Sequence, residues 1–403
     1  MHGLNEQDSK AEAPLISQKG KRVKDLIKEK IFTLILESNG ISQKQIHHSF
    51  RIRPVDLSLA IKELEADGLI LRSSVQEKRV RGRPEVFFVT DSRRIVSFAL
   101  YVESWNIHGV VLDMHGNEIY GCRQAIAGDA SPETLFRAQL DLVSQLRSAT
   151  PKTSEIAGIG ISLPGNVDTR HCIWRECQRW PSVRDMDYAD FGRETALPVD
   201  IYRDLDAQLM FEKENNPVLR DELVVLLHWG IGLGISFACR GQIIQSNHGR
   251  FGTLGFMYSS IDESQNNNGI DYECITSLRA LIQPLRAKYP GLPLDETAVA
   301  EIAKEDSFLD LPAFSKAVDY VALALRNLCT VFYPDCILLM SPFAVNRHIV
   351  ARLVEAFHSL KLMDDNRIQI PILPIGNGYS GCATGSTKQL FEKCLQKYLA
   401  VQY

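Results

Sequence analysis

The sequence predicts a small helical head followed by an α/β body made of two related lobes. Three short helical segments and a basic segment flanked by two strands, all within residues 21–90, are typical of a winged helix-turn-helix. Beyond residue 90, strands alternate with longer helices, and a strand–turn–strand unit at residues 96–120 recurs at residues 222–244. This repeat predicts a duplicated α/β fold whose two lobes close over a cleft.

Composition sets the class of protein. The chain of 403 residues is 45% hydrophobic and 23% charged, as in ordinary soluble globular proteins, and its length allows more than one domain. No apolar run approaches the roughly 18 residues of a membrane span, and the N-terminus has no basic-then-apolar signal sequence. Nine scattered cysteines suit a reducing compartment. We therefore expect a cytoplasmic protein with no membrane association.

Charge is unevenly distributed along the chain. Residues 1–90 hold 16 Lys and Arg against 12 Asp and Glu, and the remaining residues hold 29 against 37, which gives net charges of +4 and −8. A basic head on an acidic body predicts that the head alone meets a polyanion such as DNA.

The head is expected at residues 21–90, after a loose polar tail at residues 1–20. Its three helices are predicted at residues 23–38, 43–48 and 54–67, and its two strands at residues 69–72 and 86–89. Apolar residues at i, i+4, i+7 and i+8 form one face of the first helix: Ile27, Ile31, Leu34 and Ile35. Ser42 is suited to cap the second helix, and Pro54 to begin the third.

The third helix of such a module places its N-terminal residues in the major groove. The residues expected at base edges are Arg53, Val55, Asp56 and Ser58, and those expected nearer the phosphates are Arg51 and Lys62. The alternative is a helical protein-interaction module whose charges form a solvated face. The concentration of charge on the third helix and the wing favours DNA.

The wing is the basic segment Gln76–Pro84. Its sequence Arg81-Gly82-Arg83-Pro84 is similar to an AT-hook core, in which Gly and Pro keep the chain extended and two arginines enter a narrow minor groove. The residues expected to contact DNA from the wing are Arg79, Arg81, Gly82 and Arg83.

The two lobes of the body are expected at residues 91–205 and 206–403. Strands are predicted in the first lobe at residues 96–102, 107–113, 118–120, 155–162 and 199–202, with helices at residues 132–148 and from Asp204. In the second lobe, strands are predicted at residues 222–226, 235–239 and 242–244, and a C-terminal helix at residues 388–399. That last helix has an apolar face that can dock on the body or on a second subunit.

The stretch Gly230–Gly234 has glycine at alternate positions between two predicted strands. Glycines allow a tight turn and the close approach of a ligand, because no Cβ stands in the way. The functional interpretation is a phosphate-binding hairpin, and the alternative is an ordinary tight β-turn.

Several segments resemble the ROK family, a group of repressors and sugar kinases with an actin-like, hexokinase-like ATPase fold. The matching segments are Gly160–Asp168, Tyr202–Asp204, Gly230–Gly234, Tyr333–Pro342 and Gly381–Gly385, the last of which resembles a nucleotide-side turn. The head is similar to that of the repressor branch, typified by the xylose, glucose-uptake and N-acetylglucosamine regulators. Kinases of the family lack it.

Departures from the family pattern concern ATP and zinc. The Asp-x-Gly-Gly-Thr turn of the kinases is replaced by Tyr101–Trp105, where Glu103 places a carboxylate near the expected triphosphate. Two unit charges 4 Å apart at an effective dielectric near 20 repel by about 4 kcal/mol, roughly a thousandfold in affinity. The zinc-binding histidine and three cysteines of the family are also missing, and His171-Cys172 with Cys177 lacks a fourth ligand. We expect no cofactor, no metal and no catalytic residue.

The resemblance implies an effector site in the cleft. Arg203-Asp204 replaces the Asn-Asp pair of the sugar pocket, and Asp204 is expected to bind ligand hydroxyls without catalysis; its alternative role is a helix N-cap. The Glu-x-Gly-His motif is replaced by Thr253–Phe256, and Glu273 matches a glutamate that touches sugar in relatives. The expected effector-binding residues are Gly165, Asn166, Arg203, Asp204, Thr253, Phe256 and Glu273.

These features predict a sequence-specific transcriptional regulator, a repressor of carbohydrate-related genes. Its partners would be an operator in double-stranded DNA, a small-molecule effector such as a sugar or sugar derivative, and a second copy of the chain in a homodimer or dimer of dimers. Two alternatives stay open: a regulator controlled by a protein partner, with a decayed sugar site, and an active ATP-dependent sugar kinase.

Overall fold

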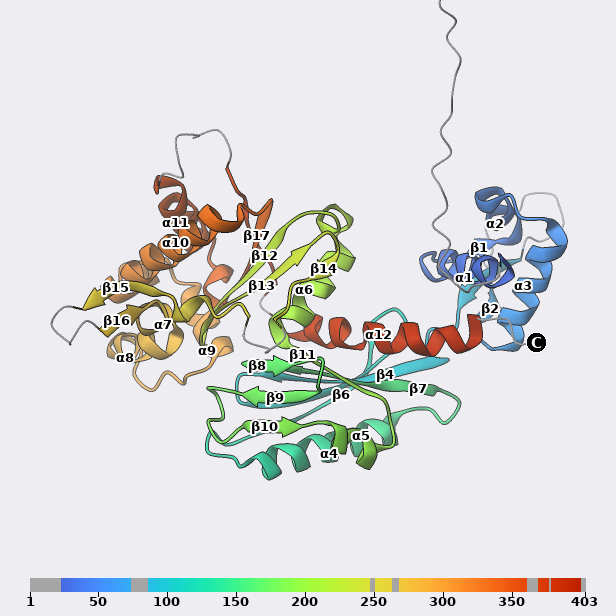
Figure 1. Cartoon of the computed structure of the whole chain (residues 1–403), viewed down its shortest axis with the longest axis horizontal. Coiled ribbons are helices and arrows are strands. Elements are labelled where there is room, and N and C mark those ends of the chain that lie inside the picture. The colour runs from blue at the N-terminus through green and yellow to red at the C-terminus, as the bar shows by residue number, and fades with distance from the viewer. Residues whose placement is uncertain are drawn as a thin grey trace, which may run out of the picture. The chain divides into compact units, whose positions relative to one another are not determined.

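The computed structural model describes residues 23–73, 86–246, 251–262, 268–360, 369–376 and 378–399 (Figure 1). The chain divides into two compact units. Residues 1–94 and 393–403 form the head unit, and residues 95–392 form the body. Within the described residues, no helix combines the length and the apolar character that crossing a bilayer requires.

The head is a three-helix module with a small antiparallel sheet. Its elements are α1 Val23–Leu36, β1 Ile41–Ser42, α2 Gln43–Phe50, α3 Pro54–Ala66, β2 Ile70–Ser73 and β3 Phe87–Thr90, with β3 between β1 and β2 in the sheet. Ser42 forms a capping box with Gln45 at the start of α2, which satisfies two backbone donors of the helix. Three helices followed by a two-stranded ribbon confirm the predicted element order.

The head is closed by buried apolar side chains and by one polar anchor. Ile31, Ile35, Leu57 and Leu64 are each at most 1% exposed. The Lys28 ammonium lies 2.9 Å from an Asp67 carboxylate oxygen, so α1 is tied to the end of α3. The wing residues Arg79, Arg81, Gly82 and Arg83 lie outside the described residues, and their DNA contacts stay predictions.

The body contains two five-stranded sheets with the same topology. The first has the order β11-β7-β4-β5-β6, and its strands are β4 Ile95–Glu103, β5 Asn106–Leu112, β6 Glu118–Ala125, β7 Glu155–Leu163 and β11 Val199–Arg203. The second has the order β14-β13-β12-β17-β18, and its strands are β12 Val224–Trp229, β13 Leu233–Cys239, β14 Gln242–Ile243, β17 Cys336–Met340 and β18 Ile372–Pro374. In each sheet three strands form an antiparallel meander and two join in parallel. The predicted duplication is confirmed.

The two meanders even turn at matched glycines. Gly116 between β5 and β6 has φ +78°, and Gly241 between β13 and β14 has φ +83°. Both positions lie in the left-handed region, which glycine adopts at little cost. These are the corresponding positions of the repeat seen in the sequence, Val110–Ile119 and Ile235–Ile244.

Helices cover both faces of each sheet. The alternation of side chains along a strand explains this arrangement: in β4, Phe98 and Leu100 pack in the core under α4 Pro132–Ala149, whereas Ala99 and Tyr101 face a second core. That second core also contains residues of α6 Asp204–Asn215, α12 Ser380–Leu399 and the inner face of the second sheet. The outer face of the second sheet packs in a third core with α8 Leu278–Lys288, α10 Pro312–Phe332 and α11 Arg347–Ser359 (Figure 1).

Helix α12 is longer than predicted. Residues Gly381–Gly385, expected as a turn, form its first turns. A Cβ at Gly381 would overlap the Gln208 side chain, and one at Gly385 would overlap the Ala207 carbonyl. The glycines are therefore needed for the close approach of α12 to α6, and not for a turn.

The remaining elements form two additions to the lobes. The first lobe carries the small sheet β10-β9-β8 and a short helix, with bounds β8 Asn166–Asp168, β9 Ile173–Glu176, β10 Arg184–Asp187 and α5 Ala189–Thr195. The second carries β15 Tyr258–Asp262, β16 Asn268–Asp271, α7 Glu273–Thr276 and α9 Glu296–Ala303. The 3-10 turns are η1 Pro217–Leu219, η2 Leu254–Phe256, η4 Asp306–Phe308 and η5 Pro342–Val345.

Candidate functional site

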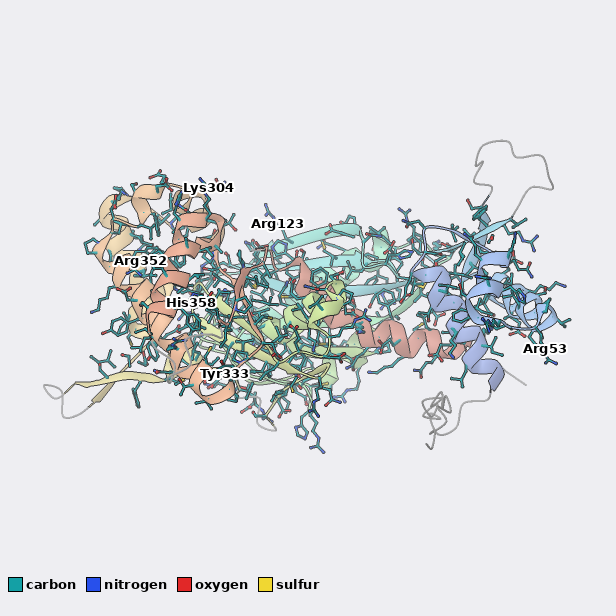
Figure 2. The ribbon with its side chains drawn as sticks, turned by 90° about the horizontal axis from the view of Figure 1, so that it is seen from above. Arg53, Arg123, Lys304, Tyr333, Arg352 and His358 are labelled. Atoms are coloured by element: carbon teal, nitrogen blue, oxygen red, sulfur yellow. The ribbon has the colours of Figure 1, made fainter. Side chains whose placement is uncertain are left out.

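The N-terminus of α3 is the exposed part of the head that the sequence assigns to DNA. Val55 is 78% exposed, although it is apolar, and it begins the helix after Pro54. The Arg53 guanidinium is exposed and lies 2.6 Å from the Asp56 carboxylate, and its side chain points outward from the head (Figure 2). An exposed methyl-bearing residue beside a basic one suits contact with base edges and phosphates.

The other head residues are placed differently. Arg51 ends α2 in a left-handed conformation, with φ 51°, and is exposed, as is Lys62. The Ser58 hydroxyl accepts a hydrogen bond of 2.9 Å from the Gln43 side chain, which ties α3 to α2. The assignment of these residues to DNA stays a prediction.

In the body, the glycine hairpin Gly230–Gly234 joins β12 to β13 and presents backbone N–H groups to two carboxylates, of which Glu296 is buried and Glu273 is half-buried. The amide of Ile231 donates to Glu296 Oε1 at 2.7 Å, and the amide of Leu233 donates to Glu273 Oε2 at 2.8 Å. None of the three glycines has a positive φ. Gly230 is needed for space, since a Cβ at this position would overlap the Glu296 carboxylate.

Glu296 belongs to a buried polar cluster. His228 Nε2 lies 3.1 Å from Glu296 Oε1, and the Tyr379 hydroxyl donates to Glu296 Oε2 at 2.9 Å. Burial alone would raise the pKa of Glu296, but the neighbouring His228 and the Ile231 amide lower that pKa to about 2. Burial lowers the pKa of His228, and the Glu296 carboxylate more than reverses this, so its pKa lies above the ordinary value. The two groups form a buried ion pair.

The first-lobe turn that would face this hairpin also carries a carboxylate. Ser104 directly follows β4 and adopts φ 51°, in the left-handed region that favours glycine. Burial raises the pKa of Glu103, and the carboxylates of Asp295 and Glu296 raise it further, so Glu103 lies within their field. The Trp105 indole donates to the Leu294 carbonyl at 3.1 Å, which links the two lobes beside the turn.

Gly165 and Asn166 lie where β7 passes into β8. Gly165 has φ +89°, and a Cβ there would lie 2.5 Å from the Glu176 carbonyl oxygen and 3.1 Å from the Cys177 Cα. Asn166 is buried, and its Oδ1 has no hydrogen-bond partner among the described residues. This turn therefore packs against the segment that follows β9.

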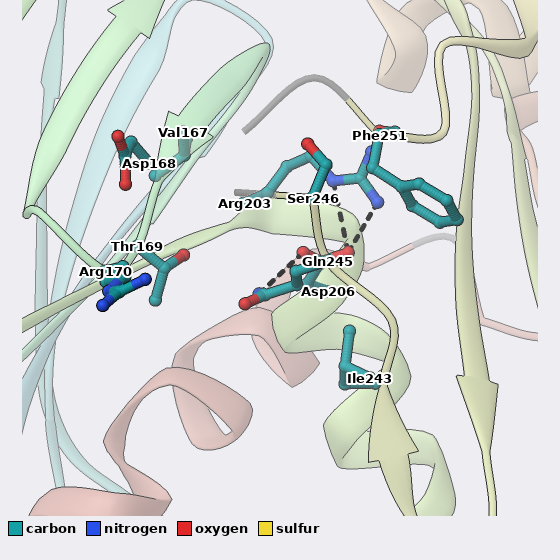
Figure 3. Close-up of a pocket in the computed structure, with 10 residues that line it drawn as sticks. All are labelled: Val167, Asp168, Thr169, Arg170, Arg203, Asp206, Ile243, Gln245, Ser246 and Phe251. Atoms are coloured by element: carbon teal, nitrogen blue, oxygen red, sulfur yellow. Dashed lines mark hydrogen bonds and ion pairs between the residues drawn. The ribbon is translucent and has the colours of Figure 1, made fainter. Parts of the chain in front are cut away.

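The Arg203 guanidinium forms its interactions with other groups of the protein. Its guanidinium lies 2.5 Å from the Asp206 carboxylate and donates to the carbonyls of Ile235, at 2.8 Å, and of Phe251. Figure 3 shows this arrangement beside a cavity of about 280 Å³, which also contains the Gln245–Asp206 hydrogen bond. Arg203 therefore joins the end of β11 to the second lobe, and its contact with an effector stays a prediction.

Asp204 is the first residue of α6, and the N-cap position belongs to Arg203. The Asp204 carboxylate accepts a hydrogen bond of 2.8 Å from the Leu205 amide. Burial raises the pKa of Asp204, against the opposing influence of His228, Arg203 and Arg179. Asp204 therefore shares the cleft with the His228–Glu296 pair.

The three remaining predicted residues belong to the second lobe. Thr253 and Phe256 are exposed, Phe256 by 52%. Glu273 begins α7, contacts Gly232 and Gly255 closely enough to exclude a Cβ, and has its pKa raised by burial. The charge of His228 lowers the pKa of both Asp204 and Glu273, against the larger effect of burial, which raises them.

Sequence reasoning missed His228, Glu296 and Tyr379, which form the buried polar cluster, and Arg179, which influences the pKa of all three. Only His228 carried a local signal, because it lies near the end of a strand, two residues before the glycine hairpin. Cys177, set aside as an incomplete metal cluster, marks the segment that carries Arg179.

Within the described residues, no group of three or more His, Cys, Asp or Glu side chains could hold a metal ion. Residues 263–267, in the loop where relatives bind zinc, lie outside this description. The expectation of no metal stays a prediction.

The model of the ROK family matches residues 106–387. The chain belongs to the ROK family.

Among ROK proteins, the DNA-binding transcriptional repressor Mlc of Escherichia coli is 20% identical over 342 residues, which cover 78% of this chain and 80% of Mlc. The solved structure of a ROK transcriptional regulator homologous to E. coli Mlc has a TM-score of 0.72 at 18% identity and covers 94% of this chain and 99% of that one. A ROK glucokinase from Streptomyces griseus, in complex with glucose and AMPPNP, has a TM-score of 0.61 at 15% identity over 74% of this chain and 99% of that one. These likenesses confirm the predicted fold and family.

Replacing Glu296 by Gln should destabilise the body by about 3–5 kcal/mol, because His228 would stay buried without its counter-charge. Equilibrium urea unfolding of the two proteins measures this difference. Glu301→Gln in the same helix is the matched control, since Glu301 pairs with Lys304 at the surface and its loss should cost at most about 1 kcal/mol. Equal losses for the two variants would contradict a buried ion pair.

The contribution of the His228–Glu296 pair to the free energy of unfolding should fall at both low and high pH. The lowered pKa of Glu296 makes its contribution complete above the ordinary value of 4.5 and lost as the pH falls toward about 2. The raised pKa of His228 makes its contribution complete below the ordinary value of 6.5 and lost as the pH rises through the folded value. The difference in unfolding free energy between wild type and Glu296→Gln should therefore be largest between pH 4.5 and 6.5. A difference that is constant from pH 3 to 9 would refute the assignment.

Proposed function

We propose that the protein is a sequence-specific DNA-binding transcriptional repressor of carbohydrate-related genes, in which the ROK body senses a small molecule. The observation that carries the proposal is a head of three helices and a small sheet, with an exposed α3 N-terminus, joined in one chain to a ROK body. The likeness to the repressor Mlc over 78% of the chain supports the same function.

The body is proposed to bind a ligand without phosphorylating it. In a phosphate-binding hairpin the backbone N–H groups must be free to meet the anion. In this chain two of them already donate to Glu296 and Glu273. Phosphate groups entering there would displace these bonds and approach carboxylates, including Glu103 on the facing turn. The proposal therefore includes no ATP, no zinc and no catalytic residue.

The proposed mechanism is a shift between two populations of the body. An effector that binds better when the lobes are closed favours that state by its difference in affinity. A dimer whose heads read half-sites about 34–36 Å apart would then lose its fit to the operator. A differential affinity of about 5.5 kcal/mol shifts a two-state equilibrium from 1:99 to 99:1, and smaller differences give partial release.

Lys62→Ala should weaken operator binding and lower its salt dependence, because Lys62 is exposed and is expected near the phosphates, and each phosphate contact that is lost reduces the slope of log K against log salt by about one. Gel shifts with DNA from upstream of its own and neighbouring genes, at several salt concentrations, measure this effect. Arg352→Ala is the control, since Arg352 lies in the body and pairs with Asp319. Specific binding to none of these fragments by the wild type would overturn the regulator proposal. A wild-type complex that every metabolite leaves unchanged would instead favour control by a protein partner.

The protein should show no sugar-dependent ATP turnover, because both sides of the expected nucleotide position carry carboxylates. A coupled ADP assay with a panel of hexoses and amino sugars checks this, with Asp204→Asn as the comparison. Turnover by the wild type that disappears in Asp204→Asn would establish a kinase with an accessory head and refute the sensing role.

A further inference from the structure

We propose that the cleft binds a small hydroxylated ligand through an anionic group, a carboxylate or a phosphoryl group, held by the Arg179 guanidinium. The inference rests on the proposed sensing function and assigns its ligand class. It concerns a residue that neither the family motifs nor the predicted effector residues include.

Arg179 is buried with an incompletely hydrogen-bonded guanidinium group. The residue is 8% exposed, and its Nε and Nη1 atoms are fully buried with no hydrogen-bond partner in the described part of the chain. A buried guanidinium that lacks a partner costs several kcal/mol, so native proteins pair such groups or hold them ready for a ligand. An anion that brings two acceptor oxygens would satisfy both the charge and the N–H groups.

The carboxylates around Arg179 are committed to other donors. Arg179 lies near enough to influence the pKa of Asp204, His228, Glu296 and Tyr379. Glu296 is engaged by His228, Tyr379 and the Ile231 amide. Asp204 accepts the Leu205 amide, so its remaining lone pairs are open to ligand hydroxyls.

A second arginine strengthens the positive field. The Nε of Arg279, at the start of α8, is buried and has no hydrogen-bond partner among the described residues. Burial lowers the pKa of Arg279, and the proximity of Arg179 lowers it further, although Glu273 opposes both effects. Two guanidinium groups that repel each other are both stabilised by an anion placed near them.

The position of Arg179 links it to predicted effector residues. It lies after β9, two residues beyond Cys177, against which the Gly165 turn packs. Asn166 in that turn has a buried Oδ1 without a partner, which can accept a hydroxyl. An anion on Arg179 and hydroxyls on Asp204 and Asn166 describe a sugar acid or a sugar phosphate. A neutral sugar would give the unpartnered N–H groups of Arg179 no charged acceptor.

The test is calorimetric titration of the full chain with three probes that share one ring: glucose, glucuronate and glucose 6-phosphate. At least one anionic probe should bind about 10–100-fold more tightly than glucose, as expected for charge-assisted hydrogen bonds. The two anionic probes distinguish a carboxylate from a phosphoryl ligand. Arg179→Gln should remove the preference, and Arg193→Gln, on the exposed surface of α5, should keep it. Equal affinity for glucose, or an anion preference that survives Arg179→Gln, would overturn the proposal.

A second measurement needs no ligand. Arg179→Met should raise the melting temperature of the free protein, because it removes a buried guanidinium group that is incompletely hydrogen-bonded, whereas Arg193→Met should leave it nearly unchanged. A lower melting temperature for Arg179→Met would show that Arg179 is structural and would refute the ligand role. Gel shifts on the same preparations separate the two proposals: operator binding without anion binding rejects only this inference, and anion binding without any operator rejects only the regulator function.

Discussion

The cleft depends on one buried ion pair, between His228 at the end of β12 and Glu296 at the start of α9. The Glu296 carboxylate also accepts hydrogen bonds from the Ile231 amide and the Tyr379 hydroxyl, so three segments that are distant in sequence meet at one side chain. A buried carboxylate must satisfy its lone pairs locally. The glycine hairpin is therefore kept in place by an internal anion, in a position where an ATPase of this fold would use an external one.

The fold was largely predictable because its signals are local. A capping serine, apolar spacing along the first helix and the repeated strand–turn–strand unit each act within a dozen residues, and tertiary structure agrees with them. The small sheet β8–β10 was missed because its strands span three or four residues and show no alternation. Helix α12 was shortened in the prediction because Gly381 and Gly385 resemble turn residues, whereas they serve the close packing of α12 on α6.

The site was predictable only in part. Asp204 and Glu273 came from the family resemblance, and the structure places both near His228. Glu296 lies 68 residues from its histidine, and no local pattern announces such a pair. No sequence motif pointed to Arg179. The feature that distinguishes it is a missing hydrogen-bond partner, a property that appears only when the surrounding side chains are placed.

The turn at Ser104 and the buried ion pair together limit what this cleft can be converted to. A nucleotide site here would need glycine in place of strained Ser104, a neutral residue in place of Glu103, and the loss of Glu296 from the hairpin. The last change alone leaves His228 charged and buried, so a variant with only that change is less stable than one in which both members of the pair are replaced. Conversion of this body to nucleotide binding therefore requires coupled substitutions, and no single substitution achieves it.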